Sequence, residues 1–581
     1  MSLQSQSLLW PGGPQRARPG TRLSQTTCAD LDVAELARAL AGRDRRRLEM
    51  VWSVLTVMGS DADTITYRQE VLEDVLADQR LVSRLSGLLP LLAELGRGDD
   101  PTAGGEDDWG VLELTRRLTD LSLYVRAVTE LRAALTEAEP RSAGLRGLHD
   151  GLAAEMGGDA FRALDEELPR LRESVKQGEC ITLAINLKPS WEPESAAILA
   201  IGPRTPGRGS MLDRLFHGAQ SEGRGLSPLR RADPVNLYHQ DNVLFRDLRT
   251  LLEATAGAAL SALEKFQAVN AGKLAHLEPE LAFYLGAAAL FHRLRAAGLP
   301  LCRPEVAPAQ ERSCHIQGGY NVALALRMLA DRDGPRRIVP SDITFDGKSG
   351  RVWILTGPNR GGKTTFIRAV GLAHILFTAG LLVPGTAARL SPVDSVITHF
   401  LAPETAKPGE GRLDEEAERL AEVFAEATPG SLVLLNEVLA GTSQVEALGL
   451  AVDAVRGFRL LGARCIYATH LHDLAAATER VNASVPEADS PVASLVAGVL
   501  GPDEPQGPEP IFLRRPGEDD DASHGPGPDP ADRGEGEPRP TFHIVPGPPR
   551  GQSFASAIAR QHGISFDQLK RKLGERGFGT T

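Results

Sequence analysis

One stretch of the chain has the residue types and spacing of a site that binds phosphate. An apolar run, Val352–Thr356, leads into the segment GPNRGGKT, which begins at Gly357 and ends with Lys363 and Thr364. Glycines let the backbone curl so that successive N–H groups point at phosphate oxygens, and a following helix adds the positive end of its dipole. Lys363 would bring a charge to the β- and γ-phosphates, and Thr364 a hydroxyl to Mg²⁺. The pattern predicts a nucleotide-binding loop between a strand and a helix.

A second candidate follows another buried-strand pattern. The run Ser431–Leu435 ends in Asn436 and Glu437. At such a strand tip, one residue holds Mg²⁺ and a carboxylate orients the attacking water. Glu437 suits the second role, whereas Asn436 keeps a carbonyl oxygen but has no charge, so it would hold Mg²⁺ more weakly. The alternative is that both residues simply begin a loop.

His470 stands at the end of a third strand pattern, Cys-Ile-Tyr-Ala-Thr-His, which begins at Cys465. A histidine at this place would hydrogen-bond a γ-phosphate and sense its loss. A lone histidine is more often structural, but the order and spacing of the strands favour the switch role.

The elements that would position these residues form an α/β region. Within residues 302–473, strand runs alternate with amphipathic helices, which is typical of a parallel sheet. Leu and Val recur at three- and four-residue spacing within 29–175 and predict helices, and the helical pattern resumes within 242–274 and 279–297. Short β-branched runs within 180–201 predict a strand pair.

The same patterns predict the domain boundaries. Residues 486–540 are dominated by Pro, Gly, Asp and Glu, a composition that buries too little apolar surface to fold. The predicted parts are a disordered lead-in at 1–28, a helical region at 29–300 with a small strand-and-loop insert near 176–241, a nucleotide-binding domain at 301–485, a disordered acidic insert at 486–540, and a C-terminal strand and helical segment at 541–581.

Composition narrows the class of protein. The 581 residues carry a formal net charge of −12 and are 42% hydrophobic, which excludes wholesale disorder. Five scattered cysteines favour neither a disulfide framework nor a zinc site. No signal peptide or membrane-spanning run is recognisable, so we expect a cytoplasmic protein without a membrane partner. Only nine of the 64 basic residues are lysines, which makes Lys363 conspicuous.

Together these segments resemble one family. GPNRGGKTT, LLNEVLAGTS and YATHLHDL, in this order and spacing, resemble the ATPase domain of MutS-type DNA mismatch-repair proteins. IQGGYN sits where that family has its entry strand, and FHIVPGPPRGQSFASAIARQHGI resembles the segment that dimerises its ATPase domains. DADTITYRQEVLEDVL looks like the lever and core region of divergent members. The resemblance implies an α/β P-loop ATPase domain of the ABC and MutS type, with a mostly parallel sheet, preceded by an all-α lever and core region.

The resemblance also implies a role for each matching residue. Lys363, Glu437 and His470 would be catalytic: Lys363 on phosphate, Glu437 on water and His470 as the γ-phosphate sensor. Mg²⁺ would be held by Thr364 and Asn436. The residues that would bind ATP are Gly357, Pro358, Asn359, Arg360, Gly361, Gly362, Lys363, Thr364, Thr365, Tyr320, Gly411 and Ser443.

The family's sites close only when two protomers meet, so the resemblance implies a homodimer, with the loop 441–443 facing the partner. Gly411 stands where the family has a serine, so its N–H would still reach phosphate but the hydroxyl is gone. With Asn436 this makes two departures, which predict hydrolysis that is slow or depends on DNA or a partner.

DNA is the expected partner, in a form that the sequence leaves open. Mismatch-sensing members carry an N-terminal Phe-x-Glu reader, which we do not find; the first 30 residues contain no Phe. Six arginines within 204–231 would neutralise phosphates, or belong to a solvated loop. Three functions remain in competition: a DNA-binding ATPase of mismatch repair or recombination, an ATP-switched protein-interaction module of the same lineage with little or no DNA binding, and a structural protein with a decayed site.

Overall fold

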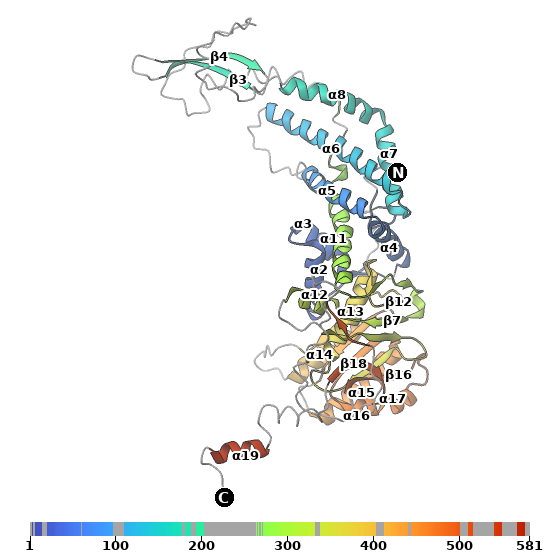
Figure 1. Cartoon of the computed structure of the whole chain (residues 1–581). Coiled ribbons are helices and arrows are strands. Elements are labelled where there is room, and N and C mark those ends of the chain that lie inside the picture. The colour runs from blue at the N-terminus through green and yellow to red at the C-terminus, as the bar shows by residue number, and fades with distance from the viewer. Residues whose placement is uncertain are drawn as a thin grey trace, which may run out of the picture. The chain divides into compact units, whose positions relative to one another are not determined.

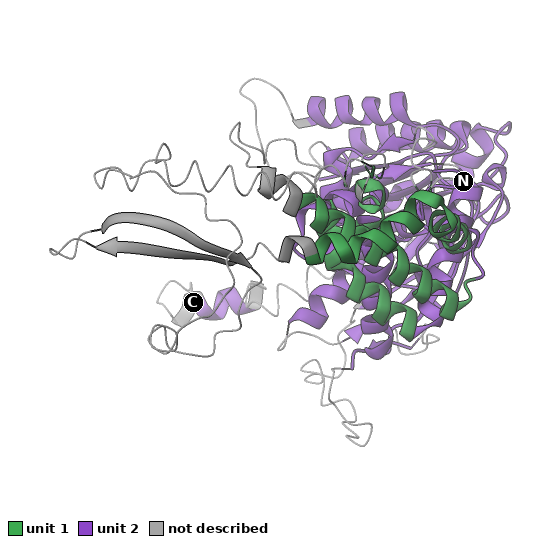
Figure 2. Cartoon of the chain, turned by 90° about the horizontal axis from the view of Figure 1, so that it is seen from above, with its two compact units in different colours: residues 1–6, 80–140, 145–278 green, residues 7–79, 141–144, 279–581 purple. Residues whose placement is uncertain are grey.

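In the computed structural model the chain forms two compact units (Figure 2). The first consists of Met1–Gln6, Arg80–Pro140 and Leu145–Glu278, and the second of Ser7–Gln79, Arg141–Gly144 and Pro279–Thr581. The residues described are 3, 6–13, 20–59, 61–96, 110–176, 180–187, 193–202, 263, 265–266, 269, 271–331, 337–401, 412–439, 443–499, 509–514, 540–548 and 566–575.

In its described residues, the first unit is helical apart from one strand pair. Its elements are α5 (Gln79–Leu95), α6 (Gly110–Ala138), α7 (Ala143–Gly157), α8 (Asp159–Lys176), the strands β3 (Cys180–Leu187) and β4 (Pro193–Gly202), and the short helix η4 (Ala271–Leu274). In α6, Tyr124, Val128 and Leu131 are buried, which is the helical spacing that the sequence shows. The helices predicted within 29–175 and the strand pair predicted within 180–201 are confirmed. Residues 203–262, which include most of the helix predicted at 242–274, lie outside the described residues.

The second unit is built on a six-stranded sheet of order β13, β14, β15, β10, β16, β18. The strands are β10 (Val352–Thr356), β13 (Val396–Phe400), β14 (Leu432–Asn436), β15 (Arg464–Ala468), β16 (Val492–Val499) and β18 (Pro540–Pro546). Neighbours from β13 to β16 run parallel, and β18 is antiparallel to β16. The α/β class is confirmed, and the sheet is mixed. Strand β10 has its predicted range, β14 begins and ends one residue later than predicted, and β15 overlaps the strand pattern that begins at Cys465.

Helices cover both faces of this sheet (Figure 1). They are α13 (Lys363–Thr378), α14 (Arg412–Glu426), α15 (Gln444–Leu461), α16 (His472–Ala476) and α17 (Thr478–Ser484). Val433 and Leu435 share a buried cluster with residues of α14 to α17. Successive strand side chains point to opposite faces, so Leu434 lies on the other face, where it packs against Gly371 of α13.

A smaller sheet, of order β6, β12, β7, β9, lies in the same unit. Its strands are β6 (Glu305–Val306), β7 (Cys314–Gly319), β9 (Ser341–Phe345) and β12 (Ala387–Leu390), with α12 (Val322–Ala330) following β7. Three two-stranded pairs complete the set: β1 (Thr21–Arg22) with β2 (Val57–Met58), β5 (Leu301–Cys302) with β11 (Val383–Pro384), and β8 (Arg337–Ile338) with β17 (Ile511–Phe512). In the described part of the chain, no helix has the length and apolarity needed to cross a membrane.

The prediction of a disordered lead-in at 1–28 needs correction for the described residues. Leu8 and Leu9 are almost completely buried. Helix α1 (Gln25–Asp30) packs on β13, where the Thr398 hydroxyl donates to Asp30 Oδ2 over 2.7 Å. Helices α2 (Val33–Ala41), α3 (Arg45–Leu55) and α4 (Ala62–Ala77) continue within the second unit, as does most of α11 (Leu277–Ala296). A few leucines among Pro, Gly and Arg show no periodicity, and only tertiary contacts bury them.

The prediction of disorder throughout 486–540 also needs correction. Residues Val492–Val499 form β16, which pairs in parallel with β10 inside the main sheet. Ile511–Phe512 form β17, and Arg514 N donates to Ala297 O at the end of α11. The run VASLVAGV is apolar enough to be a buried strand, but the Pro-rich and acidic residues around it dominate the composition.

Candidate functional site

The glycine-rich segment forms the loop between β10 and α13. All five residues of β10 are buried at the centre of the sheet. Gly357 has a φ of 140° and Gly362 a φ of 93°, which side-chain-bearing residues rarely adopt. A Cβ on Gly357 would lie 2.6 Å from the Cβ of Ala497, and one on Gly362 would lie 3.5 Å from the carbonyl oxygen of Phe542. Glycine is therefore required at position 357 by the curl of the loop and by its packing against β16, and at position 362 by the curl alone.

Lys363 is the first residue of α13 and is only 4% exposed. Its Nζ donates to the carbonyl oxygens of Gly357, over 2.9 Å, and Pro358, over 3.1 Å. Burial lowers the pKa of Lys363, and the carboxylate of Glu437 opposes this shift. Among the described residues the ammonium forms no ion pair, and an ammonium has three donors, of which two are used here. A bound anion would therefore complete the surroundings of Lys363.

Thr364 and Asn436 bring two neutral oxygens together beside Lys363. The Thr364 hydroxyl donates to Asn436 Oδ1 over 3.4 Å, across the gap between α13 and the end of β14. Hard divalent cations such as Mg²⁺ take oxygen ligands, so this pair fits such an ion. Neither oxygen carries a charge, which weakens the attraction that these two side chains offer.

Glu437 and His470 form a hydrogen-bonded pair at the tips of neighbouring strands. Nε2 of His470 lies 2.8 Å from Oε1 of Glu437, and both side chains are partly exposed. The hydrogen bond from His470 is the main cause of a lowered pKa of Glu437; burial opposes it, and the charges of His470 and Lys363 add to it. Glu437 has a φ of 58° and donates its backbone N–H to Ala468 O. The carboxylate is thus kept ionised and held by the next strand.

The sequence patterns did not single out His472, which lies beside this pair. Burial lowers the pKa of His472, with smaller effects from the charges of His470 and Lys363. Its backbone N–H donates to His470 O over 3.0 Å, and its Nδ1 is buried without a partner among the described residues. The repeated His in THLH, two residues apart, was the available signal.

Of the remaining predicted loop residues, some are buried and others are exposed. Pro358 and Gly361 are buried, and the exposed ones are Asn359, Arg360 and Thr365. Arg360 has a φ of 64°. The rim of the loop thus presents polar side chains, whereas its floor is packed.

Two further predicted residues form no hydrogen bond to the loop in the described part of the chain. Tyr320 is 3% exposed; burial raises its pKa, and its hydroxyl has no partner among the described residues. Its neighbour Asn321 does touch the first turn of α13, with Nδ2 donating to Thr365 O over 3.3 Å. Ser443 caps α15: its Oγ accepts the backbone N–H of Glu446 over 3.4 Å, and its hydroxyl donates to Glu446 Oε2 over 2.9 Å. Gly411 lies outside the described residues.

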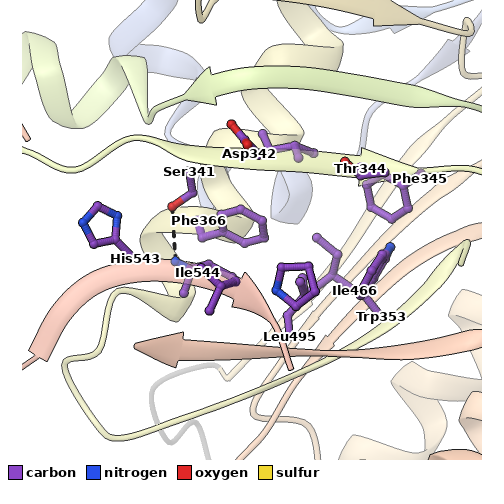
Figure 3. A pocket seen from close by; sticks show the side chains of 13 residues that line it. Ser341, Asp342, Thr344, Phe345, Trp353, Phe366, Ile466, Leu495, His543 and Ile544 are labelled. Carbon is purple, nitrogen blue, oxygen red and sulfur yellow. Dashed lines mark hydrogen bonds between the residues drawn. The ribbon is translucent and has the colours of Figure 1, made fainter. Parts of the chain in front are cut away.

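A cavity of about 210 Å³ lies between β9 and the main sheet, where β18 forms part of its wall (Figure 3). Its walls include the rings of Phe345, Trp353 and Phe366, and at one side the Ser341 hydroxyl accepts the backbone N–H of Ile544 over 3.3 Å. Phe366 belongs to the first turn of α13, whereas the lining contains no residue of the loop 357–362. The cavity therefore borders the helix that carries Lys363 without being part of the loop.

The fold and the site define an α/β domain in which a glycine-rich loop joins a central strand to a helix, with acidic and basic side chains at the neighbouring strand tips. Comparison with known proteins agrees with this. The sequence model of MutS domain V matches residues 353–492, and that of the MutS2 N-terminal domain matches residues 60–297. The chain is a divergent member of the MutS family.

Curated relatives match over different lengths. The protein of Erythrobacter litoralis described as DNA mismatch repair protein MutS is 37% identical over 190 residues, which cover 32% of this chain and 20% of that protein. The protein of Rhizobium meliloti with the same description is 27% identical over 494 residues, which cover 77% of this chain and 53% of that protein. That of Chlorobium phaeovibrioides is 30% identical over 301 residues, covering 50% and 33%. The chain thus spans between a fifth and about half of the length of these relatives.

Proposed function

We propose that this chain is a MutS-like ATPase that binds ATP at the loop before α13 and hydrolyses it. The observation that supports this most strongly is the buried ammonium of Lys363 at the start of a helix, whose hydrogen-bond partners among the described residues are the Gly357 and Pro358 carbonyls. A helix N-terminus with a buried cation beside it favours a phosphate group.

The surrounding residues suit the reaction. Lys363 would exchange its carbonyl partners for phosphate oxygens. Glu437, whose pKa is lowered chiefly by the hydrogen bond from His470, would accept a hydrogen bond from the attacking water. Held by Thr364 and Asn436, Mg²⁺ would supply positive charge where negative charge develops on the phosphates. His470 would keep the carboxylate oriented and exchange this bond for one to the γ-phosphate.

We infer that two copies complete the site, and that closure of the pair is coupled to the helical region so that DNA is gripped or released. The family assignment supports this, together with an exposed Ser443 at the start of α15. Relatives are described as DNA mismatch repair proteins, and we carry DNA over to this chain as part of the proposal.

The test compares the full chain with Lys363→Ala. Nucleotide binding is measured by calorimetry and hydrolysis by phosphate release, with duplex, mismatched and branched DNA each present or absent. We expect ATP to bind much more weakly to Lys363→Ala than to the native chain, and at least one DNA form to stimulate hydrolysis by the native chain. Equal binding of ATP to both chains would contradict the proposed site.

The DNA part of the proposal is tested separately. If ATP binds but no DNA form is retained at any salt concentration, the remaining candidate is an ATP-switched protein-interaction module. The formal net charge of −12 favours this second candidate. A partner protein whose affinity changes with ATP would then support it.

A further inference from the structure

The segment Ser7–Trp10, which we call the strap, lies in a buried site formed by side chains of α4 and α11. Leu8 N donates to Glu280 Oε2 over 2.6 Å, and the Tyr284 hydroxyl donates to Leu8 O over 2.7 Å. The strap's first carbonyl accepts from the hydroxyl of Tyr67 over 2.6 Å. Glu280 and Tyr284 are at most 2% exposed. The strap is therefore held by specific polar bonds in the interior, where water does not compete for them.

Arg68 joins the strap to the helix that begins at Lys363. Its Nε donates to Leu9 O over 2.9 Å, and its Nη1 donates to Thr378 O over 3.2 Å. Thr378 is the last residue of α13, so Arg68 sits at the opposite end of that helix from the glycine-rich loop. Arg68 is 3% exposed, and its Cζ lies 4.2 Å from the centroid of the Trp10 ring.

The turn after α13 has a glycine, Gly380, where any side chain would collide with Arg68. Gly380 has a φ of 75°, and a Cβ built on it would lie 2.2 Å from the Cβ of Arg68. Helix α4 therefore packs directly against the end of α13. Because a guanidinium is planar and its donors have fixed directions, its two bonds set the distance between Leu9 O and Thr378 O.

We propose that Arg68 is a positioning residue that couples α13, and the loop at its far end, to the strap and to α4. The proposal rests on the proposed function, since nucleotide binding at Lys363 is the input. Helix α13 has 16 residues, about 24 Å, and its hydrogen bonds make it a stiff rod. When a bound phosphate shifts the first turn of α13, the Thr378 carbonyl at the other end moves with the helix. Arg68 must then either lose that bond or carry Leu9 and α4 along.

The experiment uses hydrogen exchange with mass spectrometry on the full chain, with and without a non-hydrolysable ATP analogue and Mg²⁺. Peptides that cover the strap and α4 are followed in the native chain, in Arg68→Met and in Arg68→Lys. The matched control is Arg38→Met, since Arg38 is an exposed arginine of α2 that pairs with Glu35. Binding of the analogue is measured independently by calorimetry.

We expect the analogue to change exchange in the strap and α4 by about fivefold or more in the native chain and the control. In Arg68→Met this change should be lost while the analogue still binds, which a purely structural role would not produce. Should that variant not fold, Arg68→Lys decides, because its single ammonium keeps the charge but cannot span both carbonyls. Bound analogue with an unresponsive strap in the native chain, or an unchanged response in the Arg68 variants, overturns the coupling alone. No binding of the analogue to the native chain overturns the proposed function and the coupling with it.

Discussion

His470 holds Glu437 through a hydrogen bond of 2.8 Å between Nε2 and Oε1, and the two residues sit at the tips of the neighbouring strands β15 and β14. The bond has an electrostatic consequence: it is the largest cause of the lowered pKa of Glu437. The carboxylate therefore remains ionised to lower pH than an ordinary glutamate. Its position and its charge both depend on one neighbour.

The first prediction concerns pH. Replacing His470 by alanine removes the bond that lowers the pKa of Glu437, so this pKa should rise. The acid limb of the pH profile of hydrolysis should then move to higher pH, since a larger fraction of Glu437 is protonated at each pH. Rates measured from pH 4 to 8 test this, with the exposed His292→Ala as control. An acid limb that stays in place would show that Glu437 is not the titrating group.

The second prediction separates binding from hydrolysis. Glu437→Gln keeps the shape of the side chain but removes the carboxylate that would orient water. ATP should still bind with nearly native affinity, while hydrolysis slows by about 10²–10⁴-fold. Calorimetry and phosphate release provide the two measurements, and Glu422→Gln, on the exposed side of α14, is the matched control. Loss of binding in parallel with hydrolysis would mean that Glu437 holds the nucleotide instead.

The third prediction concerns affinity. Lys363→Ala removes a buried cation that we expect to make two charge-assisted bonds to phosphate. At about 1.5 kcal/mol for each bond, ATP should bind roughly a hundredfold more weakly. Lys348→Ala, on an exposed turn after β9, should change nothing. A native-like affinity in Lys363→Ala would remove the main support for the site.

The fourth prediction concerns the ion. Asn436→Asp adds a charge 3.4 Å from the Thr364 hydroxyl, so Mg²⁺ should be required at about tenfold lower concentration for nucleotide binding. Asn436→Ala removes the oxygen and should shift the requirement in the opposite direction. Nucleotide affinity measured across a Mg²⁺ titration distinguishes the three chains. The same Mg²⁺ dependence in all three would exclude position 436 from the ion site.

The sequence alone predicts the parts of this site that depend on local backbone chemistry. The loop around Gly357 and Gly362 is recognisable because only glycine suits its curl, and the flanking strand and helix have clear patterns. Glu437 and His470 are recognisable because each ends a buried strand, and parallel strands bring their tips to one edge.

What the sequence does not predict depends on contacts between distant segments. Leu8 and Leu9 are buried by residues of α4 and α11, and no local periodicity encodes that burial. Strand β16 is not recognisable in the sequence because the residues around it are acidic and Pro-rich, although all five residues of β10 pair with it. Tyr320 is predicted to bind ATP from the resemblance alone, and the burial of its ring depends on tertiary packing that no local pattern encodes.

The fifth prediction concerns stability. His374 of α13 is fully buried; burial, and then the charge of Arg464, lower its pKa to about 3. Between that value and the ordinary value of about 6.5, the unfolded chain binds a proton that the folded chain does not. This histidine should therefore cost stability increasingly as the pH falls below about 6.5. Denaturant unfolding at pH 7 and pH 5 should show a smaller acid loss in His374→Leu than in the native chain. An equal loss in both would contradict the assignment, and the exposed His292→Leu serves as control.

The approach of Phe542 to Gly362 has a consequence for synthesis of the chain on the ribosome. Strand β18 packs against a loop whose own residues are translated about 180 residues earlier, roughly 10–40 s at ordinary elongation rates. From the translation of Val499 to that of Pro540, the edge of β16 that β18 will cover is open, so a nascent or prematurely ended chain carries an unfinished loop. A ribosome-stalled fragment that stops before Pro540 should therefore need a chaperone that shields this edge until translation is complete.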